Sequence, residues 1–439
     1  MTDDPSELEP AVAATAGRGG VLGLLRHVAI DLSPLRTSRE FRLLWSGQAV
    51  SFLGSFVTYV AVQYQMYQLT HSSLAVGMLA LCELVPLLTM SFVGGALADA
   101  VDRRKLFLRA ETALTCVPLL LLLNALLPHP RVWPLYVLAG AAAGLDGLGR
   151  PSLWALLPQL VEKDQLASAT ALHSLYVNLG AVAGPALGGL LIATLGLRGA
   201  YGADVASFAI SLATLRAMRA TPPPDDAERP SLRSVVEGFR YARSNPVLMG
   251  TYLVDFNAMI FGMPSALFPE LAAKRFASSG LAPATVLGLL HGATYAGALL
   301  GTMTSGWVRH VRRHGAAILW SVVAWGVAIT AFGFATSLWL ALPLIAVAGA
   351  GDFVSATFRS TIWNQTIPDH LRGRLAGIEL ANVASGPLLG NAEAGAMARL
   401  TSARFSIVSG GLACLAGTAL IALLLPGFAR YRSDRGGET

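Results

Sequence analysis

Several ionisable side chains lie inside long apolar stretches of this 439-residue chain. A charge at the centre of a membrane helix costs at least about 2.5–3.5 kcal/mol, so each such residue is a candidate for function. Because loss of solvent favours the neutral form of a carboxyl group, a buried carboxyl can take up and release protons. The candidates for proton coupling are Glu83, Asp146, Arg150, Asp255, Asp352 and Glu379.

The sequence around these candidates indicates different roles for them. Asp146 and Arg150 are four residues apart, so a helix would place them on one face, where they can pair. Arg150 is equally suited to extend toward the headgroups at the membrane surface. Glu83 and Asp255 rank first as proton carriers because neither has a basic neighbour in sequence. A fixed ion pair between two halves of the protein is an alternative role for Asp255 and Asp352.

Polar side chains in the same apolar stretches could line a substrate pocket. Gln and Tyr at helical spacing can hydrogen-bond a polar aromatic molecule such as a catecholate. The residues that follow Gln63 fit an interfacial belt equally well. The candidates for the substrate cavity are Gln48, Gln63, Tyr64, Asn257 and Arg359.

The composition indicates that these residues belong to a membrane protein. Apolar residues make up 54% of the chain and charged residues 13%, against about 25% charged in soluble domains. Lipid must therefore cover much of the surface. The net charge of +6 is spread over short clusters, which argues against nucleic acid binding. Cys82, Cys116 and Cys414 lie in apolar runs without a CxxC, so neither a disulfide, a metal nor another cofactor is expected.

Twelve apolar runs reach the length of about 20 residues that spans a bilayer as a helix. They are continuous rather than alternating, so membrane strands are excluded and an all-α membrane protein is predicted. The runs lie at 42–69, 73–98, 106–127, 132–157, 165–195, 198–218, 246–270, 282–308, 315–335, 338–362, 373–398 and 404–425.

Basic residues indicate the orientation of these spans. Of the 32 Lys and Arg residues, 26 fall on one set of segments and six on the other. Cytoplasmic loops carry the basic excess, so both termini are expected in the cytoplasm. The preference for Arg over Lys, with much Ala and Gly, suggests a high-GC bacterial genome, so the bacterial cytoplasmic membrane is the expected location.

The one long polar stretch divides the spans six and six. We expect a cytoplasmic tail at 1–40, a lobe at 41–218, a cytoplasmic linker at 219–245, a second lobe at 246–425 and a cytoplasmic tail at 426–439. Within the linker, Leu232–Arg243 reads as an amphipathic segment on the membrane surface. The two halves also contain similar sequence stretches in the same order, which favours a duplicated six-helix unit. The matching stretches are Arg150, Trp154 and Pro158 with Arg359, Trp363 and Pro368, and Gly184-Pro185 with Gly386-Pro387.

A loop between spans two and three carries Gly95, Asp99, Arg103 and Arg104. Asp99 at a helix end beside basic residues could form a latch that holds the lobes closed on the cytoplasmic side. The spacing resembles the signature loop of the major facilitator superfamily, with Asp102 where that family often has Gly. The alternative is an ordinary basic cytoplasmic loop.

Span five contains glycines at helical spacing together with a proline. Gly180, Gly184 and Gly188 share one face, so a neighbouring helix can approach closely. Pro185 removes a backbone hydrogen bond and bends the helix. With Gly189, the stretch resembles the antiporter motif of the same superfamily. The alternative is ordinary packing of small residues.

The resemblance extends over roughly 40–425. Phe41–Trp45, Ala203–Phe208 and Pro368–Arg374 look like the bacterial branch with the enterobactin exporters and macrolide-type efflux proteins. The branch implies proton-driven export of a siderophore or drug, and the superfamily implies a two-lobed transporter with spans one, four, seven and ten around the cavity. The resemblance to the superfamily also implies that Arg150 helps to couple protonation to the latch.

Other functions fit the sequence less well. A multidrug or macrolide pump is the main alternative for the substrate. A membrane enzyme would need a catalytic loop, and 219–245 has none, so an enzyme is not expected. Without a Walker A motif, ATP does not drive transport directly. A lipid scramblase or a receptor is a further alternative function. We expect the protein to be a monomer.

Overall fold

The computed structural model describes residues 31–219, 240–241, 243–368 and 372–433. All regular elements in these ranges are helices. The N-terminal tail to residue 30 and most of the linker, including most of the amphipathic segment Leu232–Arg243, lie outside them.

The first lobe contains five long helices that make six spans. They are α3 (Arg39–Thr70), α4 (Ser73–Ala100), α5 (Arg103–Leu126), α6 (Trp133–Leu156) and α7 (Leu166–Ala217), preceded by the short α2 (Ser33–Thr37). Helix α7 holds spans five and six, because Gly196 breaks it with φ 70° and ψ −179°. That conformation is essentially restricted to glycine.

The second lobe repeats the arrangement with α9 (Pro246–Phe261), α11 (Pro283–Met303), α12 (His314–Phe334), α13 (Leu338–Thr366), α14 (Arg372–Leu400) and α15 (Ala403–Leu424). The short α16 (Pro426–Ala429) follows. Among the described residues, nine helices are long and apolar enough to cross a membrane. Counting α7 twice and adding α6 and α14, which are richer in polar residues and glycine, gives the predicted twelve spans.

Polar side chains begin several of these helices. The hydroxyls of Ser38 and Ser402 accept the N–H groups of Phe41 and Phe405, each at 3.1 Å. The Asp102 carboxylate accepts the N–H of Lys105 at 3.1 Å. These side chains satisfy helix N–H groups that have no partner within the helix, so they set where each span starts.

Span seven is not the continuous helix that the sequence predicted at 246–270. Helix α9 ends at Phe261, and the chain continues through η3 (Ser265–Leu267), α10 (Phe268–Glu270) and η4 (Leu271–Arg275). The break holds Gly262 and Pro264, and side chains from other spans satisfy its backbone. Trp325 Nε1 donates to Gly262 O at 3.0 Å, and Asn391 Oδ1 accepts the Ala266 N–H at 2.8 Å. Broken backbone is tolerated at membrane depth where protein groups replace its lost bonds.

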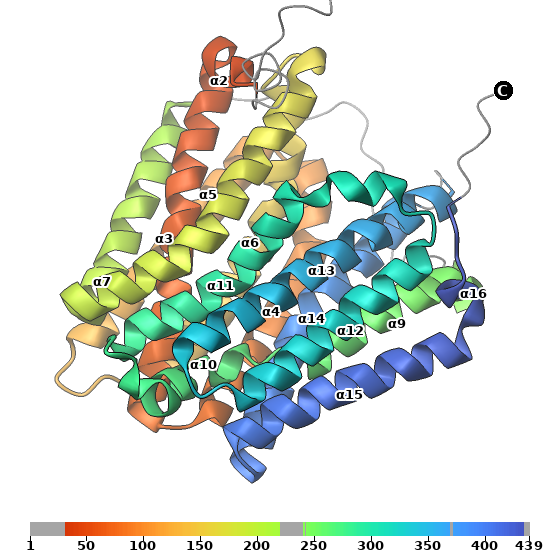
Figure 1. Cartoon of the computed structure of the whole chain (residues 1–439). Coiled ribbons are helices and arrows are strands. Elements are labelled where there is room, and N and C mark those ends of the chain that lie inside the picture. The colour runs from red at the N-terminus through yellow and green to blue at the C-terminus, as the bar shows by residue number, and fades with distance from the viewer. Residues whose placement is uncertain (1–30, 220–239, 242, 369–371, 434–439) are drawn as a thin grey trace, which may run out of the picture.

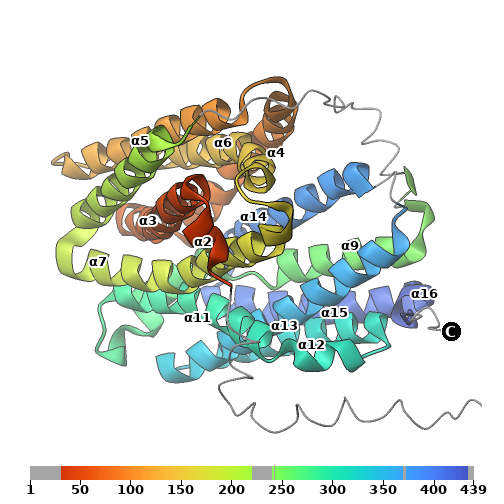
Figure 2. The same ribbon diagram turned by 90° about the horizontal axis from the view of Figure 1, so that it is seen from above.

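The described ends of the chain, at α2 and after α16, lie where the two lobes spread apart, here called the termini side (Figure 1). Across the interface between the lobes, α7 packs on α11 and α4 packs on α14 (Figure 2). Figure 1 shows the helices of the two lobes diverging from the opposite side, here called the far side.

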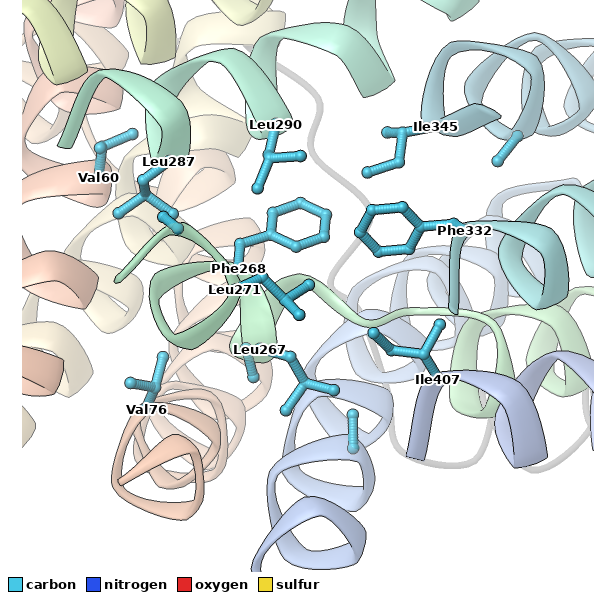
Figure 3. Packing of buried hydrophobic residues seen from close by; sticks show 14 of the residues in the cluster. Val60, Val76, Leu267, Phe268, Leu271, Leu287, Leu290, Phe332, Ile345 and Ile407 are labelled. Atoms are coloured by element: carbon cyan, nitrogen blue, oxygen red, sulfur yellow. The ribbon is translucent and has the colours of Figure 1, made fainter. Parts of the chain in front are cut away.

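A cluster of apolar side chains closes the far side. Phe268 and Leu271 from the broken span insert between Leu287 and Leu290 of α11 and Phe332 of α12, as Figure 3 shows. Val60 of α3 and Val76 of α4 bring the first lobe into the same cluster. Two polar bonds accompany this closure. Gln63 meets His291 at 3.1 Å, and Ser73 donates to Glu270 at 2.5 Å.

Candidate functional site

The first lobe encloses a cavity of about 420 Å³ that reaches the edge of the second lobe. Its walls come from α3, α4, α5, α6 and the second half of α7, and Ala266, Leu388 and Asn391 form its border with the second lobe. Phe52, Phe56 and many aliphatic side chains supply an apolar surface. The polar and charged groups on its wall include Gln48, Gln63, Glu83, Glu111, Asp146, Arg150 and Asp204.

Asp146 and Arg150 form the ion pair that their spacing predicted. Arg150 Nε lies 2.6 Å from Asp146 Oδ2, and the two side chains are 59% and 40% exposed. Both belong to α6 and line the termini-side part of the cavity. Arg150 is the one cationic side chain among the described residues of this cavity wall, and Asp146 already binds it.

Glu83 of α4 lies half-buried in the cavity wall. Among the described residues it has no hydrogen bond or ion pair, so its carboxyl group faces the cavity without a fixed partner. Of the predicted proton-coupling residues in the first lobe, Glu83 is therefore free to change its protonation state without breaking a protein contact.

Two carboxyl groups of this cavity, Glu111 of α5 and Asp204 of α7, were not among the residues predicted from the sequence. They are 5% and 1% exposed. Glu111 accepts a hydrogen bond from Gln48 at 3.0 Å, and Asp204 accepts one from Thr58 at 2.5 Å. Both interrupt apolar runs, which is the signal that could have found them. Glu111 lies two residues after Arg109 and resembles the end of the basic loop.

The second lobe gathers the remaining predicted acids around Arg359 of α13. Arg359 Nη1 forms an ion pair with Asp255 Oδ1, and the Asn382 amide donates to Asp255 Oδ2 at 2.7 Å. Asp352 and Glu379 interact electrostatically with Arg359 and Asp255. Asp255 thus has a basic partner in space although it has none nearby in sequence, and this pair lies within one lobe rather than between the two.

The remaining substrate candidates lie away from the cavity wall. Asn257 donates to Cys414 O at 2.9 Å and to Thr418 Oγ1 at 3.3 Å, which ties α9 to α15. Arg359 belongs to the acidic cluster of the second lobe. Tyr64 is absent from the described wall, so of the five candidates Gln48 and Gln63 line this cavity.

The glycines of span five face two different neighbours. Added Cβ atoms at Gly180 and Gly188 would lie 2.7 Å from Phe52 and 3.0 Å from Val57, so this face packs on α3 inside the first lobe. Gly184 faces Phe56 of the same helix. Gly189 instead faces Ala284 and Gly288 of α11, across the interface between the lobes. The motif therefore positions a cavity helix with one face and meets the other lobe at its end.

The basic residues of the predicted latch contact helix ends of their own lobe. Arg104 donates to the carbonyls of Leu215 and Arg216 at 2.9 and 3.1 Å, and Arg103 donates to Ala155 O at 3.2 Å. An added Cβ at Gly95 would meet no described atom within 4 Å. The side chain of Asp99 lies outside the described residues, and the latch stays a prediction.

In the described part of the chain, no group of three or more His, Cys, Asp and Glu residues could hold a metal ion. Two six-helix lobes that close on the far side around a partly polar cavity form the fold of the major facilitator superfamily. Solved structures agree on this fold. The nucleoside transporter NupG superposes with a TM-score of 0.70 at 12% identity, over 89% of this chain and 98% of that one. A bacterial homologue of the human lysosomal transporter Spinster, in an inward-facing and unoccupied conformation, superposes with 0.69 at 14% identity, over 90% and 98%.

The chain belongs to the transmembrane secretion effector family, whose model matches residues 29–431. It is 32% identical over 404 residues to the enterobactin exporter EntS of Citrobacter koseri. The aligned residues cover 92% of this chain and 96% of that relative. The EntS protein of Shigella boydii serotype 18 is 31% identical over 403 residues, with the same coverage. The chain is therefore a multi-pass inner-membrane efflux transporter and not an enzyme.

Proposed function

We propose that this transporter exports a small molecule in exchange for protons, and that the first-lobe cavity holds the molecule. The observation that carries the proposal is the wall of this cavity, where four carboxyl groups face one arginine. A carboxyl group can bind either a proton or a hydrogen-bond donor of the cargo. Such competition lets proton uptake release the cargo, which is what antiport requires.

The proposed orientation places the termini side in the cytoplasm. The split of 26 to six basic residues supports it. In this orientation the described conformation is open to the cytoplasm and closed to the outside by Phe268 and its neighbours. Alternating access then requires that this cluster opens while the termini side closes, with Asp99, Arg103 and Arg104 as the proposed latch.

Among the proton-coupling candidates, we propose Glu83 as the first carrier because it faces the cavity without a partner. We propose that the ion pair between Asp146 and Arg150 breaks and re-forms during the cycle. In the second lobe, Asp255, Asp352, Glu379 and Arg359 form one electrostatic group, and its proposed role is to couple proton binding to that lobe.

The proposed cargo is a siderophore of the enterobactin type, which the names of the relatives suggest. Phe52, Phe56 and Tyr59 offer rings for an aromatic molecule. Gln48 and the carboxyl groups offer acceptors for catechol hydroxyls. A second candidate is a cationic drug or macrolide, which the excess of carboxyl groups over Arg150 favours.

Transport into inverted membrane vesicles tests this proposal and separates the cargoes. With an acid interior, the proposal predicts uptake of enterobactin that stops when the pH gradient is collapsed. Uptake of cationic drugs without enterobactin would replace the first cargo with the second. If vesicles with the protein and vesicles without it took up the siderophore and a panel of drugs equally, the proposal would be contradicted.

A further inference from the structure

Span one is fastened to two other spans of the first lobe by buried carboxyl groups. Gly47 and Gly54 of α3 lie so close to the second half of α7 that added Cβ atoms would meet Thr214 and Ser207. This close approach lets side chains of α3 reach acids on the neighbouring helices. Gln48 reaches Glu111 of α5, and Thr58 reaches Asp204 of α7.

Glu111, Gln48 and Ser211 form a closed triad. Gln48 Nε2 donates to Glu111 Oε1 at 3.0 Å and to Ser211 Oγ at 3.2 Å, and Ser211 Oγ lies 3.5 Å from Glu111 Oε2. Glu111 is 5% exposed and Ser211 is fully buried. In this arrangement the carboxylate accepts from both partners, so its ionised form fits the triad without a cation.

The groups that face Glu111 leave its charge uncompensated. Asp146 of α6 and Asp204 of α7 are near enough to repel it, and Tyr176 of α7 also interacts with it. Glu83 of α4 lines the same cavity. Arg150, the cation on the described wall, is bound by Asp146. A buried carboxylate with acidic neighbours and no cation of its own takes up a proton readily.

A proton on Glu111 changes the hydrogen bonds of this triad. A protonated carboxyl group donates one hydrogen bond, and because the Gln48 nitrogen can only donate, the acceptor must be the Ser211 hydroxyl, which now acts as a donor. The bond from Gln48 to Glu111 then loses its charge assistance and becomes about half as strong. Asp204 differs from Glu111 because both of its partners, Thr58 and Ser207, are hydroxyls that can either donate or accept, and no amide donates to it.

We propose that Glu111 is a proton-binding residue of the transport cycle, and that Gln48 transmits its charge state to α3. This proposal rests on the proposed proton-driven export. It adds Glu111 as a proton-binding residue and Gln48 as the side chain that links Glu111 to α3. Proton uptake from the aqueous cavity neutralises Glu111 and weakens the hydrogen bond between α3 and α5. Helix α3, which lines the cavity over much of its length, is then held less tightly to α5, and proton loss restores the stronger bond.

The first test is gradient-driven uptake by Glu111→Gln in inverted vesicles, with enterobactin and a cationic drug panel as probes. For each coupled proton, a gradient of one pH unit can raise accumulation about tenfold. Glu111→Gln should lose this gain and keep exchange without a gradient within about twofold of wild type. The control Glu393→Gln removes a carboxyl group on α14 that is outside the described wall, and it should keep the gain. A Glu111→Gln protein that accumulates cargo as wild type does would overturn the proposal, whereas a wild type without gradient-driven uptake would overturn the proposed function.

The second test needs no cargo and applies to any folded variant. Spin labels at Ser174 of α7 and Met303 of α11, both exposed, report the separation of the lobes in a protein whose three cysteines are replaced. In wild type the distance distribution should change with pH, and Glu111→Gln and Gln48→Leu should both abolish that change. A merely structural role would alter stability but leave the pH response in place. Wild-type pH response in either variant would overturn the assignment.

Discussion

Gly189 of α7 and Gly288 of α11 meet across the interface between the lobes, where an added Cβ at Gly189 would lie 3.1 Å from Gly288 Cα. Gly77 of α4 and Gly395 of α14 make the equivalent contact at the other interface, at 3.3 Å. Both pairs lie in the far-side half of their helices. Each lobe thus contributes one glycine to each contact, and these contacts allow the backbones to approach closely enough to close the far side.

Gly189→Leu should keep the far side open. The larger side chain would collide with α11, and overpacking of this kind costs about 1–3 kcal/mol. The population should shift toward the conformation that is closed on the termini side, so labels at Ser174 and Met303 should move closer together. The matched control is Gly202→Leu on the same helix, since an added Cβ there meets no described atom within 4 Å. Equal label distances in wild type and Gly189→Leu would contradict this role.

Asp255→Asn should lower thermal stability more than any other single change at the predicted acids. The side chains of Asp255 and Arg359 are 5% and 12% exposed. Removing one partner of a buried pair costs about 3–5 kcal/mol because the other charge is left unpaired. Thermal unfolding in detergent measures the loss, and Asp255→Asn combined with Arg359→Met should recover part of it. If Asp255→Asn melts as wild type does, the pair does not stabilise the second lobe.

Glu83→Gln should leave thermal stability nearly unchanged and reduce gradient-driven uptake. Since no described side chain binds Glu83, the melting temperature should stay close to that of wild type. Gradient-driven uptake should fall by about tenfold per unit of pH gradient for each proton that Glu83 carries. Uptake in inverted vesicles and melting of the same preparation give both values. A variant with full gradient-driven uptake would remove Glu83 from the proton path.

Asn391→Ala should destabilise the broken span seven. Its Oδ1 accepts hydrogen bonds from Ser265 Oγ at 2.6 Å and from the Ala266 N–H at 2.8 Å. Loss of these acceptors would leave buried donors unsatisfied, at about 1–3 kcal/mol for each donor. Ser265→Ala is the matched variant, and it should melt higher than Asn391→Ala because the Ala266 N–H keeps its acceptor. The reverse order would show that Asn391 is not what holds the break.

The sequence contains enough local information to predict the spans and the small-residue faces. Twelve apolar runs predicted twelve spans, and the spacing of Gly180, Gly184 and Gly188 predicted one helix face, which packs on α3. The break in span seven could not be predicted in this way. Gly262 and Pro264 are tolerated in continuous membrane helices, and the acceptor that satisfies the break, Asn391, lies 125 residues further along the chain from Ala266.

The pairing of the charged residues depends equally on distant parts of the chain. Asp255 has no basic neighbour in sequence, because its partner Arg359 comes from α13, three spans later. Asp146 and Arg150 were predictable because one helix turn joins them. Glu111 interrupts an apolar run, but its partners Gln48 and Ser211 come from other spans, so its pairing is visible only once the lobe is assembled.

Simultaneous recording of enterobactin uptake and internal pH in inverted vesicles tests proton-driven export most directly. With an acid interior, each uptake event should release protons from the lumen, so the internal pH should rise faster when enterobactin is added. Glu83→Gln vesicles should show neither the uptake nor the faster rise. Enterobactin uptake that leaves the internal pH unchanged, or that proceeds equally without a gradient, would contradict proton-driven export.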